Sequence, residues 1–223
     1  MPGKQITLPL FPLNTVLFPG MTLPLRIFEH RYLQMVHDCL EGDPVFGVLL
    51  IKEGQEAGEA AVPYEVGTTA RILSVERASP DELHIVTLGE ERFLLHGVSH
   101  DKPYLVGDVE PFPLEGREAL RVEALFEAEL VLLTAYLELI SQANGVDIQL
   151  LQAVADPTEM AYLVAAVLQV PLAIKQQFLA TVDLGEMMQR QVVLLQAEIT
   201  ALTVMLRGEE LLQDSDPSEL ASN

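Results

Sequence analysis

Up to about residue 113, apolar and polar positions alternate along the chain, or apolar residues come in short runs broken by glycine and proline. A period of two with such breaks is typical of β-strands. The Ser79-Pro80-Asp81 sequence has turn chemistry and predicts a hairpin between two of these segments. Six segments fit the strand pattern, and they are ITLPLFPL, TLPLRIF, VFGVLLI, TTARILSVERA, ELHIVTLGEERFLLHGV and YLVGDVEPF.

One segment of this half has a helical period instead. In EHRYLQMVHDCLEG, residues 29–42, apolar side chains recur at steps of three and four, which predicts a helix with Gly42 as a left-handed carboxyl cap. Six short strands and one helix predict a small, closed, strongly curved sheet whose end the helix covers. The stretch at 53–63 is rich in glutamate and has no bulky apolar residue before Val62, so we expect a mobile surface loop there.

After residue 113 the period becomes helical. The segment 117–144 predicts one long helix, and the segment 184–208, with Asp183 as its amino-terminal cap, predicts another. The apolar stripe of the second long helix suits packing lengthwise against the first.

Two shorter helices are predicted between the long ones. Asp156-Pro157 combines a good cap with proline at the first helical position, so a helix should begin there and run through Gln169. Pro171 restarts the chain before a short helix over 173–180.

Together these patterns predict an α+β protein. A six-stranded β-barrel with one helix takes residues 1–113, a helical bundle with two long helices takes 114–207, and an acidic, disordered tail takes 208–223.

Composition narrows the class further. With 223 residues, 49% of them hydrophobic, the chain can bury a sizeable core without stabilisation by disulfides or metal ions. The single cysteine, Cys39, excludes an internal disulfide framework and a cysteine-based zinc site, which suits the cytoplasm. The amino terminus lacks the apolar run of a secretory signal, and no uncharged apolar run is long enough to span a bilayer. We therefore expect a soluble protein without membrane partners.

The chain is strongly acidic. Lys and Arg number 13 against 33 Asp and Glu, which gives a net charge of −20. Such a field repels phosphate backbones, so we expect no nucleic-acid partner. RNA binding would require a basic, aromatic-lined groove in spite of this charge.

Catalytic motifs are missing from the sequence. It contains neither the phosphate-binding loop G-x-x-x-x-G-K-[ST] of ATPases nor the nucleophile elbow G-x-S-x-G of hydrolases. Ser99, His100 and Asp101 are neighbours in a predicted loop, whereas a triad needs side chains that converge from separate segments. A small hydrolase with an unrecognised site stays open only if these side chains and His96 meet in a cleft.

Metal and acid–base sites have little support either. His30 and His37 share one helix face but lack a third strong ligand. Glu90 and Glu91 are adjacent strand residues that point to opposite faces, and we interpret them as a charged hairpin end. The sequence therefore predicts no catalytic residue, no cofactor and no metal site.

The run LPLFPLNTVLFPGMTLPLRIFEHRYLQMV resembles the opening of the amino-terminal substrate-binding domain of the Lon protease family. The likeness continues through the later strand segments and through DPTEMAYLVAAVL and the helical residues after it, over about residues 5–207. It implies a PUA-like barrel followed by a helical bundle, acting as a non-catalytic module that binds polypeptide. In full-length Lon an ATPase and a serine-lysine peptidase domain follow, and we expect this chain, which ends at Asn223, to lack both.

The resemblance also sets expectations about partners. These are unfolded or exposed polypeptide segments, held in a groove between barrel and bundle, together with a protease or ATPase in another chain that would make this protein an adaptor or a chaperone-like holder. A homodimer through the apolar helices stays open. The strand-to-helix junction LPLRIFEHRY is interpreted as architecture, with Phe28, Arg31 and Tyr32 as the alternative, a polypeptide-binding patch.

Overall fold

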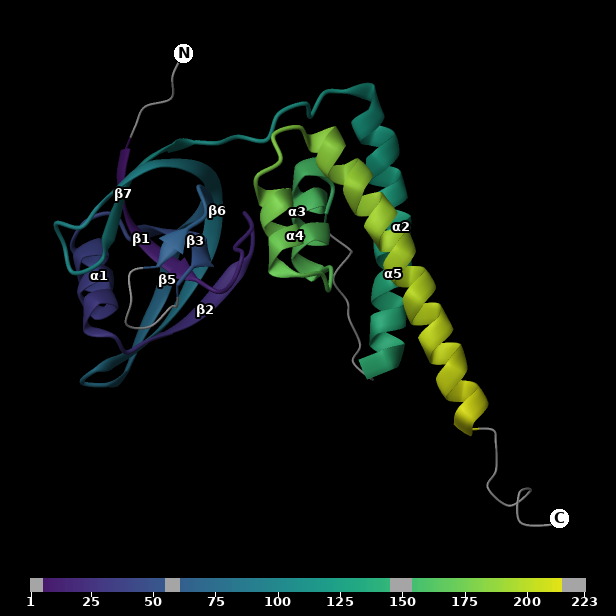
Figure 1. Ribbon diagram of the computed structural model, residues 1–223, viewed down its shortest axis with the longest axis horizontal. Coiled ribbons are helices and arrows are strands. Elements are labelled where there is room, and N and C mark those ends of the chain that lie inside the picture. The colour runs from purple at the N-terminus through teal and green to yellow at the C-terminus, as the bar shows by residue number, and fades with distance from the viewer. Residues whose placement is uncertain (1–5, 55–60, 145–153, 214–223) are drawn as a thin grey trace, which may run out of the picture.

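The structure, a computed structural model, describes residues 6–54, 61–144 and 154–213 (Figure 1). In this part of the chain, a strongly curved sheet with one helix lies at one end of the molecule, and the other helices lie at the opposite end. An extended segment after β7 (Leu105–Pro111) crosses from the sheet to the helices. The α+β class predicted from the sequence is confirmed.

Each of the six predicted segments forms a strand, and a short seventh strand joins them in one sheet. Besides β7, the strands are β1 (Ile6–Leu13), β2 (Thr22–Ile27), β3 (Val45–Glu53), β4 (Val62–Pro63), β5 (Val66–Ser79) and β6 (Glu82–Ser99). Hydrogen bonds connect β1 to β7, β7 to β6, β6 to β5, β5 to β3 and β3 back to β1. Because β2 and β4 pair outside this ring, the sheet differs from the simple six-stranded barrel that the sequence predicts.

The long strand β6 accounts for this difference. The predicted turn at Pro80-Asp81 connects it to β5, which lies along one of its edges. On the other edge, residues 83–88 pair with β2 and residues 93–99 pair with β7. Register shifts after Thr68 and Ile72 of β5 interrupt the pairing, and such irregularities bend strands. Apolar alternation marks where a strand lies, but it does not reveal that one strand changes partner halfway along.

The predicted helix of the sheet half is α1 (His30–Glu41). Its apolar stripe, which includes Tyr32 and Met35, packs into one cluster with the strand residues Phe11 and Ile27. The predicted left-handed cap at Gly42 is wrong, because this glycine has φ −123° and ψ −124°. The Gly42 N–H instead donates to the carbonyl oxygen of Cys39 at 3.1 Å, which ends the helix without a positive φ.

The four predicted helices of the second half are confirmed. They are α2 (Leu120–Asn144), α3 (Pro157–Val167), α4 (Leu172–Leu179) and α5 (Leu184–Gln213). The long helices α2 and α5 lie side by side and run in the same direction (Figure 1). Helix α5 passes through Gly208 and continues into the segment predicted as a disordered tail; the rest of that tail, residues 214–223, and residues 55–60 of the predicted loop lie outside the described residues. None of the described helices is both long and apolar enough to cross a membrane.

The hydrophobic core of the helices includes side chains from the sheet half. Val16, Phe18, Leu50 and Val66 are buried in one cluster with residues of all four helices. Polar contacts join the halves as well, since the Gln176 Nε2 donates to the Val66 carbonyl oxygen at 3.0 Å. The two parts of the chain are therefore packed against one another through a largely apolar interface.

Candidate functional site

A groove of about 840 Å³ lies where the sheet meets the helices. Its walls come from the 19–21 loop before β2, from Glu90 on β6, from the crossing segment at Leu114 and Arg117, and from α3 with the residues just before it. From the family resemblance we expect the binding surface between barrel and bundle, and the groove lies at this junction. That the groove binds polypeptide stays a prediction.

One side of α3 lines the groove with apolar surface. Tyr162, Leu163 and Ala166 share this side, and Met21 of the loop before β2 lines the same groove. The Tyr162 ring is buried and packs on Phe18, with 6.3 Å between ring centroids. Since this ring belongs to the common core, the lining is held firmly in place.

A smaller recess of about 260 Å³ adjoins the groove. Pro19, Glu90 and Tyr162 line both hollows, and Glu91 and Phe112 extend the recess along β6 and the crossing segment. The two hollows together make a trough along the junction of the halves.

Asp156 organises the helix end that faces the groove. Its Oδ1 accepts hydrogen bonds from the backbone N–H groups of Thr158 at 2.8 Å and Glu159 at 3.2 Å, so the predicted cap is confirmed. Its Oδ2 accepts a hydrogen bond from the Arg117 guanidinium on the crossing segment. Asp156 thus satisfies the positive helix end and the neighbouring cation together.

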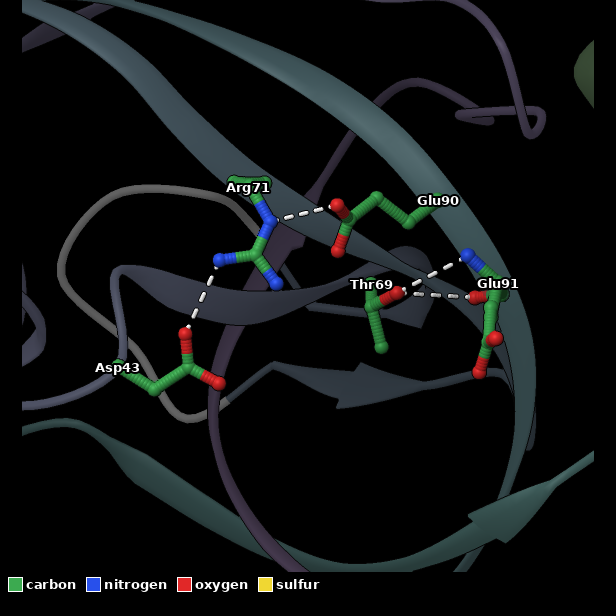
Figure 2. Close-up of polar contacts among 5 residues, drawn as sticks. All are labelled: Asp43, Thr69, Arg71, Glu90 and Glu91. Atoms are coloured by element: carbon green, nitrogen blue, oxygen red, sulfur yellow. Dashed lines mark hydrogen bonds and ion pairs between the residues drawn. The ribbon is translucent and has the colours of Figure 1, made fainter.

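Glu90 is held by a charged group on the sheet surface (Figure 2). The Arg71 Nε donates to Glu90 Oε1 at 2.5 Å, and Arg71 Nη1 donates to Asp43 Oδ1 at 3.0 Å. Beside them, Thr69 Oγ1 accepts from the backbone N–H of Glu91 at 3.0 Å. The interpretation of Glu90 and Glu91 as a charged hairpin end is wrong, because both lie in the middle of β6, as they do in the predicted strand segment ELHIVTLGEERFLLHGV.

Arg92, the next residue of β6, fastens the sheet to the helices. Its Nη1 donates to the carbonyl oxygens of Leu179 at 2.7 Å and Thr181 at 2.6 Å, and its Cζ lies 4.9 Å from the centre of the Phe112 ring. Burial lowers the pKa of this guanidinium. Burial also raises the pKa of the Tyr162 phenol, and the charge of Arg92 opposes that change.

The residues of the predicted binding patch lie away from the groove and differ in exposure. Phe28 is 58% exposed, whereas Tyr32 is 5% exposed with its ring 4.0 Å from that of Phe11. Arg31 lies over the Tyr32 ring at 4.6 Å and donates to Glu29. Burial leaves little of Tyr32 for a ligand to contact, so these contacts favour the architectural interpretation of the junction. Binding by Phe28 or Arg31 stays a prediction.

The side chains on which a hydrolase would depend do not converge. Ser99 Oγ donates to Asp101 Oδ2 at 2.5 Å within a local turn, while His96 Nε2 lies 3.0 Å from Glu110 Oε1. Among the described residues, no group of three or more His, Cys, Asp or Glu side chains is arranged to hold a metal ion.

Most groove residues were missed at the level of sequence. Pro19 and Gly20 stand in the LFPG part of the recognised run, and Asp156 was noted only as a helix cap. Their common feature is a location at the ends of elements that meet in space, and neither periodicity nor composition predicts such a meeting.

Comparisons with known proteins address the family directly. The family model described as the ATP-dependent protease La (LON) substrate-binding domain matches residues 7–197. The chain belongs to this family. Among curated relatives, the Lon protease of Anaeromyxobacter dehalogenans is 31% identical over 187 residues, and Lon protease 2 of Myxococcus xanthus is 31% identical over 185 residues. Each alignment covers 82% of this chain and 22% of the relative, so the chain spans about a fifth of the length of these proteases.

Solved structures of Lon amino-terminal domains share the fold. The Lon N-terminal domain protein from Xanthomonas campestris superposes with a TM-score of 0.57 at 27% identity, covering 84% of this chain and 98% of that one. The N-terminal domain of the Mycobacterium avium complex Lon protease superposes with a TM-score of 0.68 at 20% identity, covering 86% and 98%. This Lon substrate-binding domain therefore corresponds to nearly the whole of each solved domain.

Proposed function

We propose that this Lon substrate-binding domain is a non-catalytic module that holds unfolded or exposed polypeptide in the groove between sheet and helices. The observation that carries the proposal is the groove of about 840 Å³, lined by apolar side chains of α3 and located at the junction of the two halves. Hollows lined by apolar surface with a few polar groups are the usual binding sites of proteins. Membership of a family described by substrate binding points the same way.

The test is a binding titration with a groove-filling variant. Ala166 lines the groove on α3, and Ala166→Trp would place an indole there. Binding of a reduced, carbamidomethylated and fluorescently labelled protein should weaken at least about tenfold, because the bulky ring excludes the ligand's side chains. Ala201→Trp, an equal change at an exposed position of α5 that does not line the groove, should leave binding unchanged. Equal binding by the two variants would place the polypeptide elsewhere.

The proposal extends to an adaptor role, in which the domain passes its polypeptide to an ATPase or protease in another chain. The whole-length relatives are named Lon protease, and this chain corresponds to about a fifth of them. Affinity capture from lysate with this chain as bait, followed by mass spectrometry, tests this role. We expect repeated recovery of one ATPase or protease, and its absence would contradict the adaptor role. The cytoplasm is the proposed location, since Cys39 is buried and free.

Self-association through the helices is a separate expectation. Val131 on α2 and Val193 and Val204 on α5 are more than half exposed, which leaves apolar surface on both long helices. Sedimentation velocity over a range of protein concentrations tests self-association, and a constant monomer mass would contradict it.

A further inference from the structure

We propose that the groove selects polypeptide segments in which an apolar side chain lies beside lysine or arginine. This inference rests on the proposed function, because it names the class of polypeptide that the same groove takes. Two properties of the site carry it, namely its apolar lining and the balance of charges around that lining.

The apolar part of the ligand follows from the lining. Met21, Leu163 and Ala166 offer aliphatic surface beside the Tyr162 ring. The volume of about 840 Å³ is large enough for several bulky side chains of an extended segment. An entirely polar segment would leave this surface without a partner.

The groups that could attract an anion are already occupied or enclosed. The amino-terminal N–H groups of α3 donate to Asp156, and Arg117 is bound to the same carboxylate. Arg92 gives its Nη1 to two carbonyl oxygens, and its remaining nitrogens are buried where solvent does not reach them. The exposed guanidinium of Arg117 is thus balanced by Asp156, and Arg92 is enclosed, so a carboxylate of a bound peptide would meet no uncompensated positive charge among the described residues of the trough.

The carboxylates, by contrast, remain in excess. Glu159 on the first turn of α3 and Glu91 on β6 are exposed, and neither side chain forms an ion pair with another residue that the structure describes. Glu90 shares the single cation Arg71 with Asp43, so this group of three retains one negative charge (Figure 2). Cationic side chains next to the apolar anchor would complement Glu91 on one side of Tyr162 and Glu159 on the other.

Matched peptides test the charge preference. Three fluorescein-labelled peptides share a Leu-Phe-Leu centre that is flanked by lysines, serines or glutamates, and fluorescence anisotropy follows their binding to the full chain. We expect the lysine-flanked peptide to bind about three- to tenfold more tightly than the serine-flanked one, and the glutamate-flanked peptide to bind most weakly. The differences should shrink between about 50 mM and about 500 mM salt.

Charge variants separate the groove from the overall acidity of the chain. Glu159→Lys and Glu91→Lys should each abolish or reverse the preference for lysine flanks, and Glu159→Gln should halve it or more. Glu138→Lys changes the net charge equally on an exposed part of α2 that does not line the groove, so it should leave the preference intact.

The outcomes distinguish this inference from the proposed function. If all three peptides bind equally, or if Glu138→Lys alters the preference as much as Glu159→Lys, the charge selection is wrong while polypeptide binding stands. If no peptide and no unfolded protein binds the folded chain, the proposed function itself is wrong. Loss of peptide binding as the protein is concentrated would mean that a second copy of the chain occupies the groove, and this would also overturn the inference.

Discussion

Two buried ionisable residues, Arg92 and Glu129, differ in how their burial is compensated. Arg92 at the junction has two carbonyl acceptors and an aromatic neighbour, so its charge is partly compensated. Glu129 on α2 is fully buried, and neither of its carboxyl oxygens has a hydrogen-bond partner within the described structure. Burial raises the pKa of Glu129 to about 9, which means that it is protonated in the folded protein at neutral pH.

The pKa of Glu129 predicts a pH-dependent effect of replacing it. In the unfolded chain this carboxyl ionises near its ordinary pKa of 4.5, while in the folded chain it keeps its proton up to about 9. Stability should therefore fall as the pH rises between these values and level off above them. Glu129→Gln removes this term, so it should raise the free energy of unfolding by about 2–3 kcal/mol at pH 7 and by less at pH 5.

Urea unfolding of both proteins at pH 5, 7 and 9 measures this difference. Glu127→Gln, two residues away on the exposed side of α2, serves as the control and should show no trend with pH. A constant difference between Glu129→Gln and the unchanged chain across the three pH values would contradict the assignment.

At the scale of elements, helix α3 combines a structural task with the lining of the proposed binding groove. Asp156 and Pro157 set its start, and the turns that follow carry the apolar lining of the groove. The cap thus determines where Tyr162 and Ala166 stand relative to the sheet.

The cap gives a prediction for α3. Asp156→Ala should lower the free energy of unfolding by about 1–2 kcal/mol, because the N–H groups of Thr158 and Glu159 lose their acceptor. Asp156→Asn keeps an acceptor and loses only the exposed pair with Arg117, so it should cost less than about 1 kcal/mol. Thermal unfolding followed by circular dichroism compares the two variants, and equal losses would mean that the ion pair rather than the cap stabilises this helix.

The elements were largely predictable because their signals are local. The caps Asp156 and Asp183, the turn at Pro80-Asp81 and the apolar stripes each act over a few residues, and the structure confirms them. One feature that was not predicted depends on distant partners, because β6 changes neighbours along its length. The other is local, because Gly42 ends α1 through a bond to Cys39 and without the left-handed geometry that glycine favours there. The family resemblance set the expectation of a groove between barrel and bundle, but the residues that line it were not predicted, since its walls are brought together only by the packing of the two halves.

At the scale of the whole molecule, the junction decides whether the halves behave as one body. Sheet residues are buried in the helical core, and Arg92 and Gln176 add hydrogen bonds across the boundary. A groove between parts that are fastened in this way has a fixed width, and a binding site with fixed walls loses little entropy when a ligand enters.

This packing predicts cooperative unfolding. Amides in β6 and in α4 should exchange with the same opening free energy in native-state hydrogen exchange, because the halves cannot separate without exposing their shared core. Arg92→Met should lower both values by about 2–4 kcal/mol, since two buried carbonyl oxygens lose their donor. Lower values in α4 alone would show that the helical half opens independently.

The pairing of β1 also sets the order in which the chain can be completed. One edge of β1 pairs with β3 and the other with β7, which ends near residue 111. Both edges can be covered only after roughly 100 residues have left the ribosome, which takes about 5–20 s at ordinary rates of synthesis. During that time an apolar strand is exposed to other nascent chains. Pro9 and Pro12 lack the N–H donors that a neighbouring strand would need, which makes β1 a poor template for aggregation. The prolines of β1 thus reduce its pairing with other nascent chains during the time before β3 and β7 are available.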